Sequence, residues 1–487
     1  MTPRHATHAT HRMMGNMLLN LMAKLAVRAL GFVVFIYQTN YLKERYGIYV
    51  FVVQLAMALL AFIDLGWSVV IVREIGRAPE KASQYLANFL ALETFVAAFF
   101  ACGLIGYVII AGESPEKIRL AAIAAIGVYF GGLSRAPLGV LVARQRSGLA
   151  SMADLGTNLL SSLATLIAVH WRAPISAFIW INNGYYIVLF AVFCAMAARV
   201  AGPLRWRIDR ALWRGLLRLG LPSSMIAGTY VLYTTLDVMM LSRMSTDLRM
   251  SIYGVALKLT NPLLMFVEAS MMAIYPVLAA RHDTDPAGFR FLLNKSLKLM
   301  LGLGMPIALG ISLLSPEIIQ ALITPRLWAS IVTLRILVWR LPLLFAYSPI
   351  NHALLAGGRL KTLAGMNIAA VLMNFILNLL LIPRYGENGA AIATVCSHAT
   401  ILLIYLSLRS TFYSVGMRWA DLARLILSLL AMAAVVWIAR EAMANTPALI
   451  RLAALIALGA ITYSITAFAT HFLGPEERSF LTRYFRR

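Results

Sequence analysis

The sequence predicts an all-helical protein with many membrane-spanning helices, and two observations support that fold class. Hydrophobic residues make up 61% of the 487 residues and charged residues only 13%, with a mean hydropathy of +0.78, whereas soluble domains carry about 25% charged residues. Apolar stretches of about 20 residues, the length that crosses a bilayer as a helix, recur from Asn16 almost to the C-terminus. They are too long and too continuous for barrel strands, so a helical bundle is expected.

Fourteen segments have the length and hydropathy of a membrane-spanning helix. The first of them follows a polar tail and lacks a small-residue cleavage pattern, so we interpret it as a permanent helix and not as a signal peptide. The expected spans are residues 16–40, 48–72, 84–110, 118–143, 149–170, 174–198, 216–241, 250–275, 294–315, 328–356, 362–383, 386–408, 420–440 and 446–472.

Basic residues gather in alternate loops, which indicates the orientation of the helices. One set of loops holds Arg144, Arg146 and the basic run 199–218, whereas the other set holds scattered charges such as Lys43 and Arg384. The positive-inside rule places the first set in the cytoplasm, and an even number of spans then places both termini there. The formal net charge of +23 is therefore a signal of topology, and no nucleic-acid partner is expected.

Two stretches of the chain repeat each other. The segments LVARQRSGLASMAD, from Leu141, and LLAGGRLKTLAGMN, from Leu354, align without a gap and pair Asp154 with Asn367. Helices one to six and seven to twelve are therefore expected to be two related halves, parallel because six is an even number. The predicted organisation is a cytoplasmic tail (1–15), an N-terminal six-helix half (16–198), a basic cytoplasmic linker (199–215), a C-terminal six-helix half (216–408), two extra helices (409–472) and a basic cytoplasmic tail (473–487).

Charged side chains inside predicted helices give the strongest functional signal. The first helix carries Lys24 and Arg28 one turn apart on the same face, and a charge at that depth costs several kcal/mol. One interpretation is that the pair faces a water-filled cavity and its cargo. The alternative is an internal ion pair with Asp64 or Glu93, which lie at a similar depth in the second and third helices.

Other intramembrane charges are open to the same two interpretations. Arg335 and Arg340 share a helix but point in different directions, so only Arg340, nearer the middle, is expected to line a cavity. Asp237 and Lys258 lie on consecutive antiparallel helices and are expected to form a salt bridge, as a brace or a gate latch. The predicted cavity residues are Arg28, Lys24, Arg135, Arg340 and Lys258, and the predicted gating or ion-coupling residues are Asp64, Glu93, Asp237 and Glu268.

Several short patterns resemble a known transporter family. They are the openings RYGIYVF and IYGVALKL, the segment FIDLGW, and the stretch LLLIPRYGENGAAIATV. Together with the two six-helix halves, they are similar to the polysaccharide-transporter branch of the multidrug/oligosaccharidyl-lipid/polysaccharide (MOP) flippase superfamily. Within that branch, the chain resembles the Wzx-type O-antigen and exopolysaccharide flippases, with the lipid II flippase MurJ a more distant relative.

The resemblance implies a V-shaped bundle that moves a polyprenyl-pyrophosphate-linked oligosaccharide across a bacterial inner membrane by alternating access. The glycan and pyrophosphate would occupy a hydrophilic cavity between the halves, with the polyprenyl tail in lipid. A polysaccharide polymerase and a chain-length regulator are the implied partners. Arginine chelates phosphate oxygens bidentately, so cations at membrane depth are the chemistry that such a cargo requires.

The sequence gives no support for enzymatic chemistry. It contains no phosphate-binding P-loop, no metal-ligand cluster and no nucleophile–base signature, and Cys102, Cys194 and Cys396 lie far apart in apolar segments. We therefore expect no enzyme activity and no cofactor or metal, with energy supplied by a proton, sodium or substrate gradient.

Two other functions remain open. A multidrug antiporter of the same superfamily should have a cavity dominated by carboxylates, whereas cations dominate here. A membrane-embedded polysaccharide polymerase or ligase should have a large external loop, whereas every external loop predicted here is short.

Overall fold

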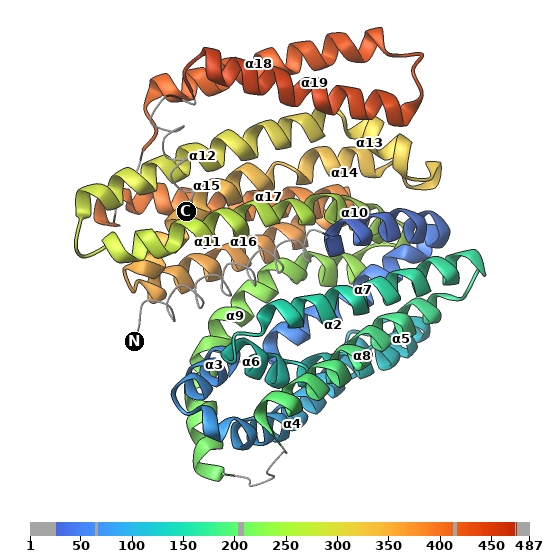
Figure 1. The fold of residues 1–487 in the computed structure, drawn as a ribbon. Helices are drawn as coiled ribbons and strands as arrows, with labels where there is room; N and C mark the ends of the chain where they lie inside the picture. The colour runs from blue at the N-terminus through green and yellow to red at the C-terminus, as the bar shows by residue number, and fades with distance from the viewer. Residues whose placement is uncertain (1–25, 64–66, 203–208, 413–415, 473, 475–487) are drawn as a thin grey trace. The chain divides into compact units, whose positions relative to one another are not determined.

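The computed structural model of the chain consists almost wholly of helices (Figure 1). It describes residues 26–63, 67–202, 209–412, 416–472 and 474, and these residues contain no strand. The chain divides into two compact units, Met1–Arg243 and Met244–Arg487. The predicted all-helical class is confirmed.

The first unit begins with a helix over residues 26–42. Its further elements are η1 (Lys43–Arg45), α2 (Tyr46–Ile63), α3 (Trp67–Arg77), η2 (Pro79–Lys81), α4 (Ala82–Ile110), α5 (Pro115–Leu133), α6 (Arg135–Ala143), α7 (Ser147–His170), α8 (Ile175–Ala201) and α9 (Arg210–Met244). A buried cluster around Trp67, Ile71 and Phe89 joins α3 and α4 to α6 and forms part of the core.

The second unit holds the remaining elements, and its last two helices pack against each other (Figure 1). The elements are α10 (Asp247–Thr260), η3 (Asn261–Leu264), α11 (Met265–Arg281), α12 (Pro286–Leu313), α13 (Ser315–Leu322), η4 (Pro325–Leu327), α14 (Ser330–Leu337), α15 (Arg340–Ala356), α16 (Leu360–Tyr385), α17 (Glu387–Phe412), α18 (Trp419–Ala442) and α19 (Ala448–Ala469).

The helices have the length and composition of membrane spans. Among the described residues, 12 helical runs are long and apolar enough to cross a membrane. One of these runs, Ala26–Ile63, covers two predicted helices that meet at η1, where Lys43 has a φ of 51°. Another predicted span belongs to α9, a helix of 35 residues outside the twelve. The chain is a multi-pass membrane protein, and the count of fourteen stays a prediction.

Several predicted spans are broken within the structure. The span 118–143 is divided between α5 and α6, and the span 328–356 is divided between α14 and α15. Both second pieces begin with the pattern Arg-x-Pro. Proline is tolerated in a first turn, where its missing N–H had no intrahelical partner, but not in a helix interior. Because hydropathy does not report such breaks, the sequence predicted single helices.

The helix boundaries agree with the predicted repeat. In the first unit α6 ends at Ala143 and α7 begins at Ser147. In the second unit α15 ends at Ala356 and α16 begins at Leu360. Each later boundary lies 213 residues after its counterpart, which is the register that aligns the two sequence segments.

The compact units divide the chain at a different point from the predicted halves. The helix predicted to open the second half corresponds to α9, which is held to the first unit near both ends. Near one end, Trp67 Nε1 donates to the Leu216 carbonyl at 3.1 Å. Near the other, the Ser242 hydroxyl donates to Glu113 at 3.1 Å and accepts from Lys117 at 3.0 Å. The predicted domain boundaries describe a sequence repeat, and as domain boundaries they stay a prediction.

Candidate functional site

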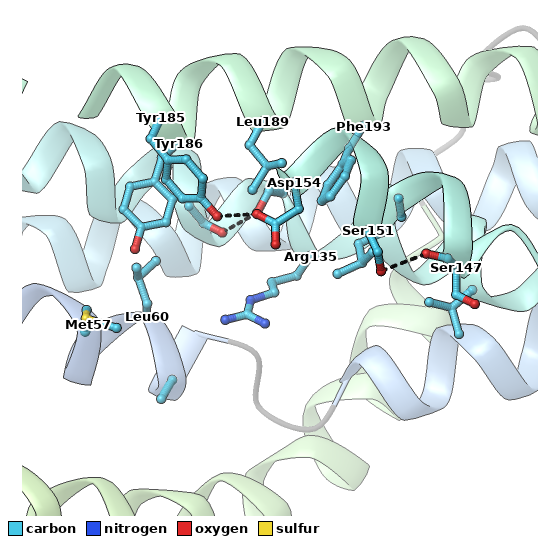
Figure 2. A pocket seen from close by; sticks show the side chains of 16 residues that line it. Met57, Leu60, Arg135, Ser147, Ser151, Asp154, Tyr185, Tyr186, Leu189 and Phe193 are labelled. Atoms are coloured by element: carbon cyan, nitrogen blue, oxygen red, sulfur yellow. Dashed lines mark hydrogen bonds between the residues drawn. The ribbon is translucent and has the colours of Figure 1, made fainter. Parts of the chain in front are cut away.

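A polar pocket lies within the first unit, between α2, α5, α6, α7 and α8 (Figure 2). Its volume is about 480 Å³. Most of its wall is aliphatic or aromatic. The charged and phenolic groups come from Arg135 of α6, Asp154 of α7, and Tyr185 and Tyr186 of α8. The pocket is therefore a mainly apolar cavity that holds a guanidinium, a carboxylate and two phenols inside a membrane-spanning unit.

The start of α6 is fixed by two contacts. The carboxylate of Glu93, only 1% exposed on α4, accepts the N–H of Ala136 at 3.2 Å, and a helix N-terminus favours a carboxylate there. One turn further on, a Cβ added to Gly139 would lie 2.2 Å from Cγ2 of Ile71, so α6 touches α3 directly. Both contacts hold Arg135, the first residue of α6, at the pocket.

Arg135 contributes a positive charge to this pocket. Within the part of the chain that the structure describes, its guanidinium makes no hydrogen bond and no ion pair. A charged side chain at membrane depth is costly unless it meets water, an opposite charge or a ligand. The guanidinium is thus available to an anionic group, in a pocket that also carries the Asp154 carboxylate.

The α7 and α8 side of the pocket carries a hydrogen-bonded carboxylate. Asp154 Oδ1 accepts the Tyr185 hydroxyl at 2.6 Å and the Asn158 amide at 3.1 Å. The rings of Tyr185 and Tyr186 meet edge to face, with centroids 4.9 Å apart. Figure 2 shows this pair and the Arg135 side chain in the same pocket. The wall therefore combines a carboxylate with aromatic surface.

Close packing between α5 and α8 fixes the position of Tyr186. A Cβ on Gly131 would lie 2.9 Å from Cδ1 of Tyr186 and 2.8 Å from Cδ2 of Leu60. Nearby, the Asn183 amide donates to the Ile123 carbonyl at 2.7 Å. The absence of a side chain at Gly131 therefore allows the Tyr186 ring to lie against α5.

Of the predicted site residues of the first unit, some lie at the pocket and others do not. Arg135 lines the pocket, and Glu93 binds the backbone next to it. Arg28 lies half-buried on the helix of residues 26–42. Lys24 and Asp64 lie outside the described residues. The structure therefore brings together Glu93 and Arg135, two residues that the sequence placed on separate helices.

The predicted residues of the second unit do not line this pocket. Arg340 is 8% exposed and donates to the Thr260 hydroxyl at 2.9 Å and to the Asn261 side-chain carbonyl at 2.5 Å. Lys258 and Glu268 are exposed on α10 and α11. Asp237 is buried on α9, which belongs to the first unit, so its salt bridge with Lys258 stays a prediction.

Buried ion pairs in the second unit were not predicted. Lys298 of α12 donates to Asp421 of α18 at 3.1 Å, and the two side chains are 9% and 11% exposed. The Lys298 ammonium also lies 5.1 Å from the ring centre of Phe472. Arg440 of α18 pairs with Glu317 of α13. These pairs connect one of the two extra helices to the rest of the unit.

An apolar pocket lies beside these pairs, between α12, α13, α18 and α19. Its volume is about 500 Å³, and its wall is almost wholly aliphatic. The hydroxyl of Tyr463, one of its few polar groups, donates to the Gly302 carbonyl at 2.6 Å. None of the predicted site residues lines it. The pocket is therefore suited to a hydrocarbon and not to a charged group.

Asp154, Tyr185 and Tyr186 were not predicted as site residues. Asp154 entered only as the counterpart of Asn367 in the repeat. A charge present in one repeat and absent from the other is a signal that would have found it. The tyrosines lack such a signal, because aromatic residues are common in membrane helices.

Comparison with known proteins assigns the family. The family model described as "Polysaccharide biosynthesis protein" matches residues 13–282, more than half of the chain. The chain belongs to the polysaccharide biosynthesis protein family. A second model, MatE, matches residues 222–380. The predicted resemblance to flippases of the MOP superfamily is thereby confirmed.

One curated relative of this family member is the "Probable low-salt glycan biosynthesis flippase Agl15" of Haloferax volcanii. The two chains are 24% identical over 206 residues, which cover 42% of this chain and 44% of the relative. The match thus spans less than half of that protein.

Solved structures share the fold of this polysaccharide biosynthesis protein. The lipid II flippase MurJ in an inward closed conformation aligns over 96% of this chain and 100% of its own, with a TM-score of 0.76 and 18% identity. An inward-facing MATE family multidrug transporter aligns over 81% and 98%, with a TM-score of 0.62 and 15% identity. All three of these proteins carry flippase or transporter names, in agreement with the expectation that the chain is not an enzyme.

Proposed function

We propose that this protein is a flippase that moves a polyprenyl-pyrophosphate-linked oligosaccharide from the cytoplasmic to the periplasmic leaflet, for O-antigen or exopolysaccharide synthesis. Family membership and the MurJ-like fold support this proposal. The basic loops support a bacterial inner membrane location with both termini in the cytoplasm. A polysaccharide polymerase and a chain-length regulator would act on the product.

The observation that carries the proposal is the Arg135 guanidinium in the polar pocket. Within the described residues it has no hydrogen-bond or ion-pair partner. An anion could therefore bind the guanidinium without displacing a carboxylate of the chain. A guanidinium binds two phosphate oxygens through parallel N–H bonds, which suits a pyrophosphate. We place the pyrophosphate at Arg135, and Lys24 and Arg28 stay candidate cations predicted from the sequence.

The apolar pocket of the second unit is suited by itself to a hydrocarbon chain, such as that of a lipid. Each CH₂ group that leaves water for an apolar site gains about 0.8 kcal/mol, and the wall of this pocket is almost wholly aliphatic. A hydrocarbon tail that already lies in lipid gains little free energy by entering the pocket. The pocket would therefore fix where the tail lies and add little to the binding affinity. Energy would come from a proton or sodium gradient, with Glu93, Asp237 and Glu268 as candidate coupling residues.

A multidrug antiporter is the second candidate function. The match of residues 222–380 to the MatE model favours it. Against it, the Arg135 guanidinium would repel the cationic drugs that such antiporters carry, although the Asp154 carboxylate of the same pocket would attract them. A polymerase or ligase has no comparable observation in its favour.

Depletion of the protein in its host tests the proposal. We expect a polyprenyl-pyrophosphate-linked sugar to accumulate in the cytoplasmic leaflet. The measurement is lipid extraction after labelling with an impermeant sugar oxidant, in right-side-out and inside-out vesicles. Accumulation of no lipid-linked sugar would contradict the flippase function. Accumulation of a cationic dye in the depleted cells instead would favour the antiporter.

A further inference from the structure

The Asp154 carboxylate has a free oxygen that faces a pocket with a cation. Both hydrogen bonds to this carboxylate, from Tyr185 and Asn158, end on Oδ1. Among the residues that the structure describes, none donates to Oδ2. Asp154 is half-buried and lines the pocket (Figure 2). The residue is thus held in place through one oxygen, and the other is available to a ligand.

Asp154 and Arg135 line one pocket without forming an ion pair with each other. A ligand that is only an anion gains at Arg135 but is repelled by Asp154. A ligand that has both an anionic group and hydrogen-bond donors satisfies both residues. A carboxylate accepts such donors in charge-assisted bonds, which are about twice as strong as neutral ones.

The tyrosines next to Asp154 complete a surface for a sugar ring. A pyranose has an apolar face of C–H groups and a rim of hydroxyls. Tyr185 and Tyr186 present apolar rings, and the Tyr185 hydroxyl is already occupied by Asp154. The ring face and the free carboxylate oxygen therefore match the two kinds of surface on one sugar.

We infer that Asp154, Tyr185 and Tyr186 form a sugar subsite beside the anion site of Arg135. The subsite takes the sugar attached to the pyrophosphate, and that sugar presents hydroxyl or amino donors to Asp154 Oδ2. A sugar with a carboxylate at this position is excluded by repulsion. The inference rests on the proposed function, because it takes the anion at Arg135 to be the phosphate of a glycan carrier.

Soluble fragments of the cargo test this subsite on the full chain in lipid nanodiscs. The probes are inorganic phosphate, glucose 1-phosphate, glucosamine 1-phosphate and glucuronic acid 1-phosphate, and calorimetry measures each Kd. For the unaltered protein we expect glucose or glucosamine 1-phosphate to bind about tenfold more tightly than inorganic phosphate, the effect of one charge-assisted hydrogen bond. Glucuronic acid 1-phosphate should show no such gain.

Asp154→Asn should remove this preference while leaving the Kd of inorganic phosphate equal or lower. The amide keeps an acceptor for Tyr185 but presents N–H groups to the sugar. An equal loss for both sugars indicates hydroxyl donors, and a larger loss for glucosamine 1-phosphate indicates the ammonium. Tyr185→Phe keeps the ring and should weaken the sugar probes by a few fold. Asp283→Asn, on a residue whose side chain is 89% exposed, is the matched control.

Three outcomes would overturn the subsite. They are no preference for sugar phosphates in the unaltered protein, an unchanged preference in Asp154→Asn, or an equal loss of inorganic phosphate binding in that variant. Failure of the anion site is seen separately, as a normal Kd for inorganic phosphate in Arg135→Ala. Thermal melting in detergent verifies that each variant is folded.

Discussion

Arg135 and Arg340 occupy the same local position and have opposite surroundings. Each is the first residue of a helix that begins Arg-x-Pro after a break, α6 in the first unit and α15 in the second. Arg135 lines a pocket and has no hydrogen-bond or ion-pair partner in the described part of the chain. Arg340 is buried against Thr260 and Asn261. An identical local pattern thus leaves an open guanidinium in one unit and forms an internal cross-link in the other.

The repeat register, which carries Arg135 onto Ser348 and not onto Arg340, shows a related contrast at the sugar subsite. The register that pairs Asp154 with Asn367 also carries Tyr185 onto His398. His398 is 5% exposed, and its Nδ1 forms a hydrogen bond of 2.9 Å with the Tyr347 hydroxyl. The charge of Asp154 therefore belongs to the first half alone. In the second unit, Lys298 and Arg440 bind carboxylates of the chain itself.

The largest stability effect is expected at the Lys298–Asp421 pair. Asp421→Ala leaves a buried ammonium without its carboxylate and should destabilise the protein by about 3 to 5 kcal/mol. Lys298→Met should cost less, because Arg424 still donates to Asp421 at 3.3 Å. The double variant should recover part of the loss. Thermal melting in detergent measures this, and strictly additive losses would show that the pair is not coupled.

Removal of Arg340 should cost stability rather than transport. Arg340→Ala takes two charge-assisted hydrogen bonds from Thr260 and Asn261, a loss of about 1 to 3 kcal/mol. The amount of folded protein in the membrane and its melting temperature should fall, with transport per folded molecule retained. Lost transport at a normal melting temperature would place Arg340 among the cargo-binding residues and remove its contrast with Arg135.

A smaller effect is expected from Gly131→Ala. The new methyl group would displace the Tyr186 ring and narrow the pocket, with an overpacking cost of about 1 to 3 kcal/mol. Gly184→Ala is the matched control, because a Cβ there meets nothing within 4 Å and alanine favours a helix. Sugar phosphate binding and melting temperature are compared for the two variants. Equal binding and equal melting temperatures in the two variants would mean that the Tyr186 ring moves aside without cost, which would contradict the close packing at Gly131.

The sequence was sufficient to predict the features that depend on residue type and on spacing along the chain. Hydropathy identified the membrane class, and the alignment of Leu141 with Leu354 anticipated that the end of α6 would match the end of α15 and the start of α7 the start of α16. The cost of an intramembrane charge drew attention to Arg135 together with other intramembrane cations, and its role in binding stays a prediction. The membrane class was predictable because hydropathy is a property of the residues themselves, and the aligned boundaries because the repeat is a matter of spacing along the chain.

The remaining features depend on contacts between distant residues. Whether an intramembrane arginine is open or engaged is decided by neighbours such as Thr260, 80 residues from Arg340. The Lys298–Asp421 pair joins residues 123 positions apart. The breaks before α6 and α15 are an exception, because the prolines beside them are visible in the sequence and only hydropathy fails to report them. Hydropathy is blind to all three, so the sequence treated Arg340 and Arg135 alike.

The most direct test of the account is a side-by-side assay of surface polysaccharide and folded, membrane-inserted protein for Arg135→Ala. Arg119→Ala, on the exposed face of α5, is the control. We expect Arg135→Ala to lower polysaccharide export at least tenfold, because it removes the group that binds the phosphate. The folded yield should stay normal, because no carboxylate of the chain is left without its counter-charge. Arg135→Lys should retain part of the export, since it keeps the charge without the bidentate geometry. Full export by Arg135→Ala, or a loss explained by reduced folded protein, would contradict the claim that this pocket binds the pyrophosphate.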